Sequence, residues 1–184
     1  MTDTMRRVGR CHVFGDDIPL DDGLIPFEMA IRRIDDPQRL LPELLRMVDP
    51  AFPDRVRPGD IIVAGTNFGC GKPHFQGFIA MAALGLSVLC VSMPYKTLRG
   101  AISKGVPVLA GLPAGGAFAR TGHRLDVDFR TGAVVNLDTG QRVDVPPLSP
   151  LLADVVRRGG TRGTLAAWLD THPDMRLPVE APRA

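Results

Sequence analysis

Three short apolar runs, separated by two helical patterns, constrain the fold of this chain most strongly. The runs are 61–64, 87–91 and 107–109. A continuous apolar run is typical of a strand that is buried on both faces. The two intervening segments are 73–84 and 95–104. They end at Gly85 and Gly105, as helices often do. This order predicts a βαβαβ unit, whose parallel strands are joined by right-handed crossovers.

The pattern changes in the last third of the chain. Residues 125–129 alternate between apolar and polar side chains, and two further short strands are expected at 134–137 and 142–145. Turns at 131–132 and 138–140 separate them, which predicts an antiparallel meander with one solvated face. The expected fold class is therefore α/β, with a parallel core and an antiparallel meander.

The final part of the chain predicts helices and then a tail. Ser149 and Pro150 are typical of a helix start, and this amphipathic helix should end at Gly159. A short helix is expected over 164–170. With 184 residues, one domain over 1–170 and a flexible, proline-rich tail over 171–184 are expected.

The first sixty residues carry weaker signals. A short strand is expected over 10–14, and an acidic turn follows it. Asp36 followed by Pro37 is a typical helix start, and Pro42 should kink the helix. Residues 49–59, which include three prolines, are expected to form a loop.

Composition excludes several classes of partner. The chain has 22 Lys and Arg against 20 Asp and Glu, and only 5% of its residues are aromatic. This balance argues against a nucleic-acid-binding surface. The most apolar segment, 78–91, is shorter than the ~20 residues that span a bilayer, so no membrane partner is expected.

The three cysteines predict a reducing compartment. Cys11, Cys70 and Cys90 are unclustered and fit no metal-ligand spacing. We therefore expect a cytoplasmic protein without disulfides. We also expect no metal and no iron–sulfur cluster on this chain.

The glycine-rich segment 65–74 is the best candidate for a functional site. It follows a buried strand and precedes a predicted helix, and ligands bind at this carboxyl edge of parallel sheets. Its backbone N–H groups and the helix N-terminus would favour a carboxylate or a phosphate. It is not a nucleotide-binding P-loop, because five residues rather than four separate Gly65 from Gly71 and Pro73 replaces the required Ser or Thr. A glycine-rich turn without a ligand is the alternative.

A family resemblance centres on this loop. The run Asn67-Phe68-Gly69-Cys70-Gly71 resembles a motif of the 3-isopropylmalate dehydratase small subunits, the swivelling domain of the aconitase superfamily. Further similar stretches occur in the same order along most of the chain. They are 15–22, 49–52, 58–65, 105–109 and 147–160. The resemblance implies the swivelling β/β/α fold.

The resemblance also implies a two-subunit dehydratase or isomerase that acts on a small hydroxy acid. A large subunit would hold a [4Fe-4S] cluster, whose open iron is a Lewis acid toward the substrate hydroxyl. The small subunit would close over this cluster and supply a base and carboxylate-binding groups.

This sequence departs from the family at the positions of those groups. Relatives continue the motif with Ser-Ser-Arg-Glu-His, in which the first Ser is the base and the Arg binds a carboxylate. Here Lys72 replaces that Ser and His74 replaces that Arg. Two further arginines of the family are replaced by Glu28 and Tyr95. We therefore expect a hydroxy acid with fewer or differently placed carboxylates.

The candidate catalytic residues are His74, Lys72 and Asp21. His74 is expected in the first turn of a helix, where an imidazole can accept a proton near pH 7. Lys72 would bind a carboxylate, or act as the base itself. Asp21 matches the active-site aspartate of the family and would orient the base or a water molecule. A solvated lysine, a capping histidine and a solvated acidic loop are the alternatives.

The candidate substrate-binding residues are Asn67, Gly69, Cys70 and Gly71 of the family motif. Cys70 is expected to pack rather than to react, because no base lies at a defined spacing from it. The remaining histidines, His12, His123 and His172, are expected to be structural.

Two functions remain open at this point. The first is a catalytic small subunit of an aconitase-type hydro-lyase. The second is a non-catalytic binding or regulatory module that has kept the fold and lost the serine and the arginines. A coexpressed, cluster-bearing large subunit with hydro-lyase activity would favour the first.

Overall fold

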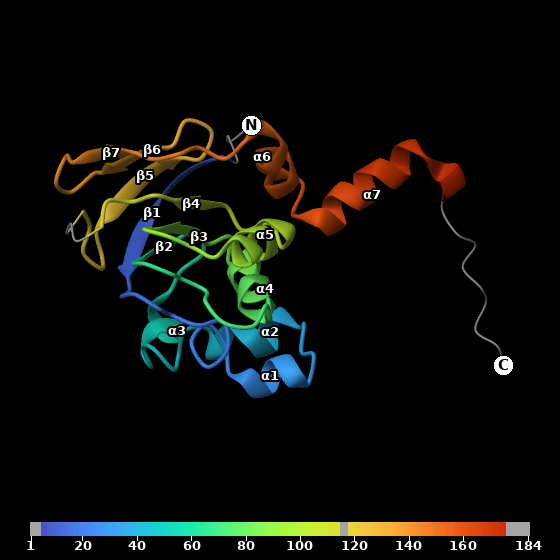
Figure 1. Ribbon diagram of the computed structural model, residues 1–184, viewed down its shortest axis with the longest axis horizontal. Coiled ribbons are helices and arrows are strands. Elements are labelled where there is room, and N and C mark those ends of the chain that lie inside the picture. Colours follow the sequence, from blue (N-terminus) through green and yellow to red (C-terminus); the bar gives the residue numbers. More distant parts are fainter. Residues whose placement is uncertain (1–4, 115–117, 176–184) are drawn as a thin grey trace.

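The fold was analysed in a computed structural model, which describes residues 5–114 and 118–175. Figure 1 shows a curled sheet with helices along one side and one end. The strands are β1 (Arg6–Val13), β2 (Ile61–Ala64), β3 (Ser87–Cys90), β4 (Val108–Ala110), β5 (Arg124–Asp128), β6 (Ala133–Asn136) and β7 (Arg142–Asp144). The α-helices are α1 (Phe27–Ile31), α2 (Pro37–Leu40), α3 (Phe52–Arg55), α4 (Gln76–Ala83), α5 (Tyr95–Ser103), α6 (Pro150–Arg157) and α7 (Thr161–Thr171). Short 3₁₀ helices lie at η1 (Leu41–Glu43) and η2 (Pro173–Met175).

All seven strands form one sheet in the order β4-β3-β2-β1-β5-β6-β7. The strands β1 to β4 are parallel, and β5 to β7 form the antiparallel meander, so both predicted parts are confirmed. Strand β1 joins them, because residues 6–10 pair with β5 and residues 11–13 pair with β2.

Two apolar cores lie on opposite faces of the parallel strands. Ile62 and Val88 face one core, which the helices α2 and α4 cover. Ile61 and Leu89 face the other core, which the meander closes by curling over it (Figure 1). The parallel strands are therefore buried on both faces, which explains why their sequences are continuously apolar.

The first sixty residues differ from the prediction in three places. Strand β1 begins at Arg6 rather than at residue 10, because its first half pairs with β5. Asp36 caps α2 as expected, with its side chain accepting from the Gln38 N–H at 3.0 Å. This helix ends at Leu40, and Pro42 lies in a 3₁₀ turn rather than in a kinked helix. The expected loop at 49–59 contains α3.

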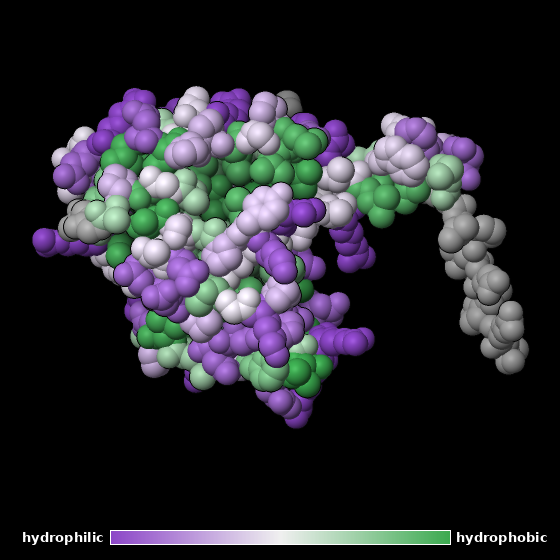
Figure 2. Space-filling model, viewed as in Figure 1, coloured by the Kyte–Doolittle hydropathy of each residue, from purple (hydrophilic) through white to green (hydrophobic). Residues whose placement is uncertain are grey.

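Of the two C-terminal helices, α6 begins where the sequence predicted and α7 is longer than predicted. Ser149 caps α6 by accepting from the Leu152 N–H at 3.4 Å. Helix α7 begins at Thr161 rather than at 164, directly after Gly160. It projects from the body in Figure 1, and Figure 2 shows apolar residues along it. Leu165 and Trp168 of α7 are 54% and 42% exposed.

The domain boundary at residue 170 stays a prediction, and α7 runs one residue past it. Most of the predicted tail, 176–184, lies outside the described residues. Within 5–114 and 118–175, no helix is both long and apolar enough to cross a bilayer.

Candidate active site

The glycine-rich loop lies at the carboxyl end of β2, where the sequence placed it, and the acidic turn 15–22 runs beside it. The N–H of Gly65 donates to the Gly15 carbonyl at 3.1 Å. The Asp16 carboxylate accepts from the Thr66 N–H at 2.6 Å. These bonds join two segments that are fifty residues apart and make them one structural unit.

Asn67 connects this unit to the next strand. Its side-chain amide donates to the Asp17 carboxylate at 2.7 Å, and its backbone N–H donates to the Ser92 hydroxyl at 2.8 Å. Ser92 follows β3, whose carboxyl end lies at the same edge of the sheet. Asn67 therefore holds the loop in place, because its amide is committed to Asp17.

Gly69 is enclosed by its neighbours. Its N–H donates to the Ile18 carbonyl at 2.7 Å, and its carbonyl accepts from the Thr97 hydroxyl at 2.6 Å. It adopts φ +75°, and a Cβ at this position would lie 2.4 Å from the Thr97 methyl group. Only glycine fits here without a shift of Thr97, and its N–H is not free to bind a ligand.

Gly71 differs from Cys70 in its backbone N–H group. Cys70 forms an isolated parallel bridge with Pro19, in which its N–H is directed to the Ile18 carbonyl, and its thiol lies 3.6 Å from the Asp17 carbonyl. Gly71 is exposed with φ +92°, and within the described residues its N–H has no hydrogen-bond partner. One donor at the surface of the loop is thus available to an anion.

His74 and Asp21 form a direct pair. Both carboxylate oxygens of Asp21 lie 2.8 Å from Nδ1 of the imidazole. The side chains are 32% and 19% exposed, so the pair is partly shielded and open on one side. Nε2 of His74 has no hydrogen-bond partner among the described side chains.

The start of α1 supports this pair. The ring of Phe27 lies 5.7 Å from the His74 ring, centre to centre, at 44°. The carboxylate of Asp22 accepts from the Phe27 N–H at 2.9 Å and so fixes where this helix begins. The imidazole therefore lies between an aromatic ring and a carboxylate.

The expectation that His74 lies in the first turn of a helix is wrong. Helix α4 begins at Gln76 with Phe75 at its N-cap, not at residue 73. The surroundings of His74 are therefore set by Asp21 rather than by a helix terminus.

A turn of the backbone accounts for this late helix start. Gly71 takes a left-handed conformation, and the His74 N–H then donates to the Lys72 carbonyl at 2.8 Å. The ring of Phe75 packs onto Gly100 of α5, where a Cβ would lie 2.3 Å from the ring. This packing holds residues 72–75 in a turn that points His74 toward the acidic segment.

The side chain of Lys72 is exposed and forms no hydrogen bond or ion pair with any described residue. Lys72 is adjacent in sequence to Gly71. A flexible ammonium group therefore lies close to the available backbone N–H of Gly71.

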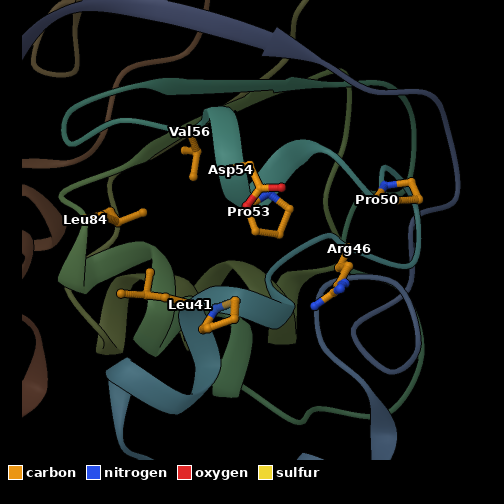
Figure 3. A pocket seen from close by; sticks show the side chains of 8 residues that line it. Leu41, Arg46, Pro50, Pro53, Asp54, Val56 and Leu84 are labelled. Carbon is orange, nitrogen blue, oxygen red and sulfur yellow. The ribbon is translucent and has the colours of Figure 1, made fainter.

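Of two cavities, the first borders the glycine-rich loop and the second does not. One, of about 420 Å³, opens beside the start of the loop and is lined by Gly65 and Thr66 together with apolar side chains such as Phe14 and Val91. Another, of about 330 Å³, lies between η1 and α3 (Figure 3). None of the residues proposed for the site lines this second cavity.

Two of the three cysteines are buried in the cores. Burial raises the pKa of the Cys11 thiol to about 11 and that of the Cys90 thiol to about 12. In the described segments, no cluster of three or more His, Cys, Asp or Glu side chains could hold a metal ion.

Ser92 and Thr97 are supporting residues that the sequence analysis did not identify. The position of Ser92 after a parallel strand was the available signal, since loops that follow parallel strands meet at one sheet edge. Nothing local marks Thr97, because its role depends on the approach of Gly69 from a distant part of the chain.

Comparisons with known proteins identify the family. No family model matches the chain. It is 38% identical over 161 residues to 3-isopropylmalate dehydratase small subunit 1 of Methanopyrus kandleri, covering 87% of this chain and 91% of that protein. It is 35% identical over 164 residues to the 3-isopropylmalate dehydratase small subunit of Moorella thermoacetica, covering 89% of this chain and 96% of that protein.

A solved structure agrees with these relatives. The crystal structure of 3-isopropylmalate dehydratase from Methanocaldococcus jannaschii aligns with a TM-score of 0.82 and 28% identity, covering 94% of this chain and all of that one. This likeness confirms the expected swivelling fold. The chain therefore belongs to the family of 3-isopropylmalate dehydratase small subunits, which are subunits of aconitase-type hydro-lyases.

Proposed function

We propose that this chain is a catalytic small subunit in which His74 is the base that removes a proton from a hydroxy acid. The observation that carries the proposal is the contact of both Asp21 carboxylate oxygens with Nδ1 of His74 at 2.8 Å. A carboxylate can only accept here, so Nδ1 carries the proton and Nε2 carries the lone pair. The same arrangement fixes the imidazole as a base in other enzymes.

The carboxylate of the substrate would bind beside this base. The N–H group of Gly71 is a donor to it, and Lys72 supplies a positive charge. Dehydration removes a proton from a carbon next to a carboxylate, so a base and an anion site in one turn suit this chemistry. Asn67 and Gly69 were expected to bind substrate; we propose that they position this turn, because the Asn67 amide donates to Asp17 and the Gly69 N–H donates to the Ile18 carbonyl.

A large subunit is the partner that the small-subunit family implies. The [4Fe-4S] cluster expected on that subunit would supply a Lewis acid for the leaving hydroxyl group. This chain would close over the substrate from the other side, holding its carboxylate and taking its proton. Three free cysteines, two of them buried, fit a reducing compartment such as the cytoplasm.

The relatives are named for 3-isopropylmalate, but the substrate of this chain is expected to differ. Glu28 and Tyr95 stand at positions where the family has arginines, and His74, at a third, is committed to Asp21. Loss of a charge-assisted contact costs roughly 2–3 kcal/mol, about 30- to 150-fold in kcat/KM. We expect the highest kcat/KM for a hydroxy acid with fewer or differently placed carboxylates.

The test is to coexpress the chain with a large subunit of the same family and organism and to purify the complex. Iron and sulfide should copurify with the pair, and dehydration of a panel of hydroxy acids should be followed by ultraviolet absorbance. Activity that is lost in His74→Ala supports the proposal. An active complex in which neither His74→Ala nor Lys72→Ala matters would place the base on the partner. A complex without hydro-lyase activity would favour a regulatory module.

A further inference from the structure

A second polar site lies at the opposite end of β2 from the glycine-rich loop. Asp60 directly precedes β2 and Gly65 directly follows it, and a four-residue strand spans roughly 13 Å. His12 of β1 and Asp60 face each other there, with Nε2 2.8 Å from the carboxylate. Their side chains are 7% and 8% exposed. The proposed reaction uses neither residue.

The hydrogen bonds define the state of this buried pair. The Nε of Arg55 lies 3.5 Å from Nδ1 of His12, and an arginine N–H can only donate. Nδ1 is therefore an acceptor, and the ring carries its proton on Nε2, where it donates to Asp60. Asp60 also accepts the Arg57 backbone N–H at 2.8 Å. Phe52 packs edge-on against the imidazole, with 5.1 Å between ring centres.

A cavity of about 780 Å³ opens over this pair, and we call it the His12 cavity. It is bordered by strand β1, helix α3 and the segment before β2. Its polar lining residues are Arg10, His12, Asp54, Arg55, Arg57, Asp60 and Thr121. Asp54 also borders the smaller cavity of Figure 3, so α3 separates the two.

The charged groups of the His12 cavity are only partly paired. Arg55 pairs with Asp49, and the Asp60 carboxylate accepts from the neutral His12 ring and from a backbone N–H. Among the described residues, the guanidinium of Arg57 donates to the carbonyls of Asp54 and Val56, at 2.9 Å each, and to no carboxylate.

Arg10 has no carboxylate partner among the described residues. The carboxylate of Asp54 likewise has none within the described chain. The two guanidinium groups are balanced in charge by the carboxylates of Asp54 and Asp60, but each keeps N–H groups that have no partner among the described residues. Arginines at the mouth of a cavity with a polar, hydrogen-bonded floor are suited to an oxyanion, which they can bind in a bidentate manner.

We propose that the His12 cavity binds a small ligand through a carboxylate or phosphate group held by Arg10 and Arg57. Thr121 adds a hydroxyl that already accepts from the Val13 N–H at 2.9 Å and so has its proton left to donate. His12 and Asp60 form the rigid floor under the ligand. The site is separate from the His74 loop, so it can be occupied while substrate is bound.

Binding is tested on the full chain labelled with ¹⁵N, titrated with inorganic phosphate in one series and with malonate in another. Amide signals of Arg57 and Thr121 should shift saturably below about 10 mM ligand. A response to phosphate alone or to malonate alone identifies the class of anion. No saturable shift in either series overturns the proposal, and so do shifts confined to Gly71 and Lys72.

Variants separate this site from general charge attraction. Arg10→Gln should weaken binding about tenfold, the loss expected for one charged hydrogen bond. Arg7→Gln is the matched control, because it removes the same charge from the same strand on the opposite face. Equal weakening in both variants overturns the proposal. Lys72→Ala should leave the Arg57 shifts unchanged, so failure here is distinct from failure of the proposed reaction.

Discussion

Asp21 contacts Nδ1 of His74 through both of its carboxylate oxygens, at 2.8 Å each, across 53 residues of sequence. The pair joins the acidic turn to the glycine-rich loop at the carboxyl edge of the sheet. Because the imidazole proton is fixed on Nδ1, the proposed reaction assigns the other ring nitrogen to take a proton from substrate. The first two predictions test this geometry.

Substitution of either member of the pair should lower kcat. We expect His74→Ala to lower kcat by about 10²-fold or more, with little change in KM, because a base acts in the transition state. Asp21→Asn should lower kcat by a similar factor, since an amide N–H can donate to Nδ1 and stabilise the other tautomer. Steady-state kinetics of the complex measure both effects. The matched control is Asp35→Asn, an exposed aspartate without a partner among the described residues.

Lys72→Ala should act mainly on KM. The lysine is exposed and its ammonium group has no partner in the described part of the chain, so its expected contribution is to attract and hold the substrate carboxylate. An increase in KM of about tenfold with kcat nearly unchanged is expected. Lys104→Ala, at the far end of α5, should change neither constant. A large fall in kcat for Lys72→Ala with none for His74→Ala would transfer the base role to the lysine.

Gly69→Ala should lower the free energy of unfolding more than Gly140→Ala does. Gly69 and Gly140 have φ of +75° and +74°, so alanine carries a similar backbone cost of about 1 kcal/mol at both. Only at Gly69 would the new Cβ meet another side chain, the methyl group of Thr97. We expect an additional loss of roughly 1–3 kcal/mol in the free energy of unfolding, measured in urea.

The double variant Gly69→Ala with Thr97→Ser checks that explanation. Serine keeps the hydroxyl that donates to the Gly69 carbonyl and lacks the obstructing methyl group. Recovery of much of the additional loss is expected. If the double variant is no more stable than Gly69→Ala alone, the contact with Thr97 is not the cause.

The buried cysteines should make the protein less stable in base. Burial raises the pKa values of Cys11 and Cys90 from 9.0 to about 11 and about 12. Above pH 9 the unfolded chain loses these protons while the folded chain keeps them, so ionisation favours unfolding. The free energy of unfolding should therefore fall between pH 8 and pH 10.5. Cys90→Ala should make the fall of the unfolding free energy with pH less steep. In the native protein, Cys70 should react with a thiol reagent before the two buried cysteines do.

The parallel core could be predicted from sequence because burial on both faces leaves a local mark. Ile61, Ile62 and Val63 are continuously apolar since each face of β2 meets a core. The early part of β1 leaves no such mark. Arg6 pairs with Asp126 at 2.6 Å. The residues that hold this half of the strand in place are therefore 120 positions away in the sequence.

The candidate site was predictable in its location and in part of its chemistry. A glycine-rich loop after a buried strand indicated that the site lies at the carboxyl edge of the parallel sheet. The family resemblance then made Asp21 and His74 candidates for the same site. The start of α4 was misplaced, because Pro73 is a good first helical residue and nothing in the local sequence reveals the packing of Phe75 onto Gly100. The buried pair of His12 and Asp60 was equally hidden, since each residue alone is an ordinary polar position.

The exchange of partners along β1 has a consequence for how the protein unfolds. Gly9 lies where the strand passes from one partner to the other, and a Cβ there would lie 2.4 Å from the Gly59 carbonyl oxygen. If β1 is removed, β2 of the parallel layer and β5 of the meander both lose their hydrogen-bonded neighbour. Neither half is therefore an independent folding unit. Deuterium should therefore enter the amides of Cys11 and Val127 at the same slow rate, set by global opening of the chain rather than by local fluctuation.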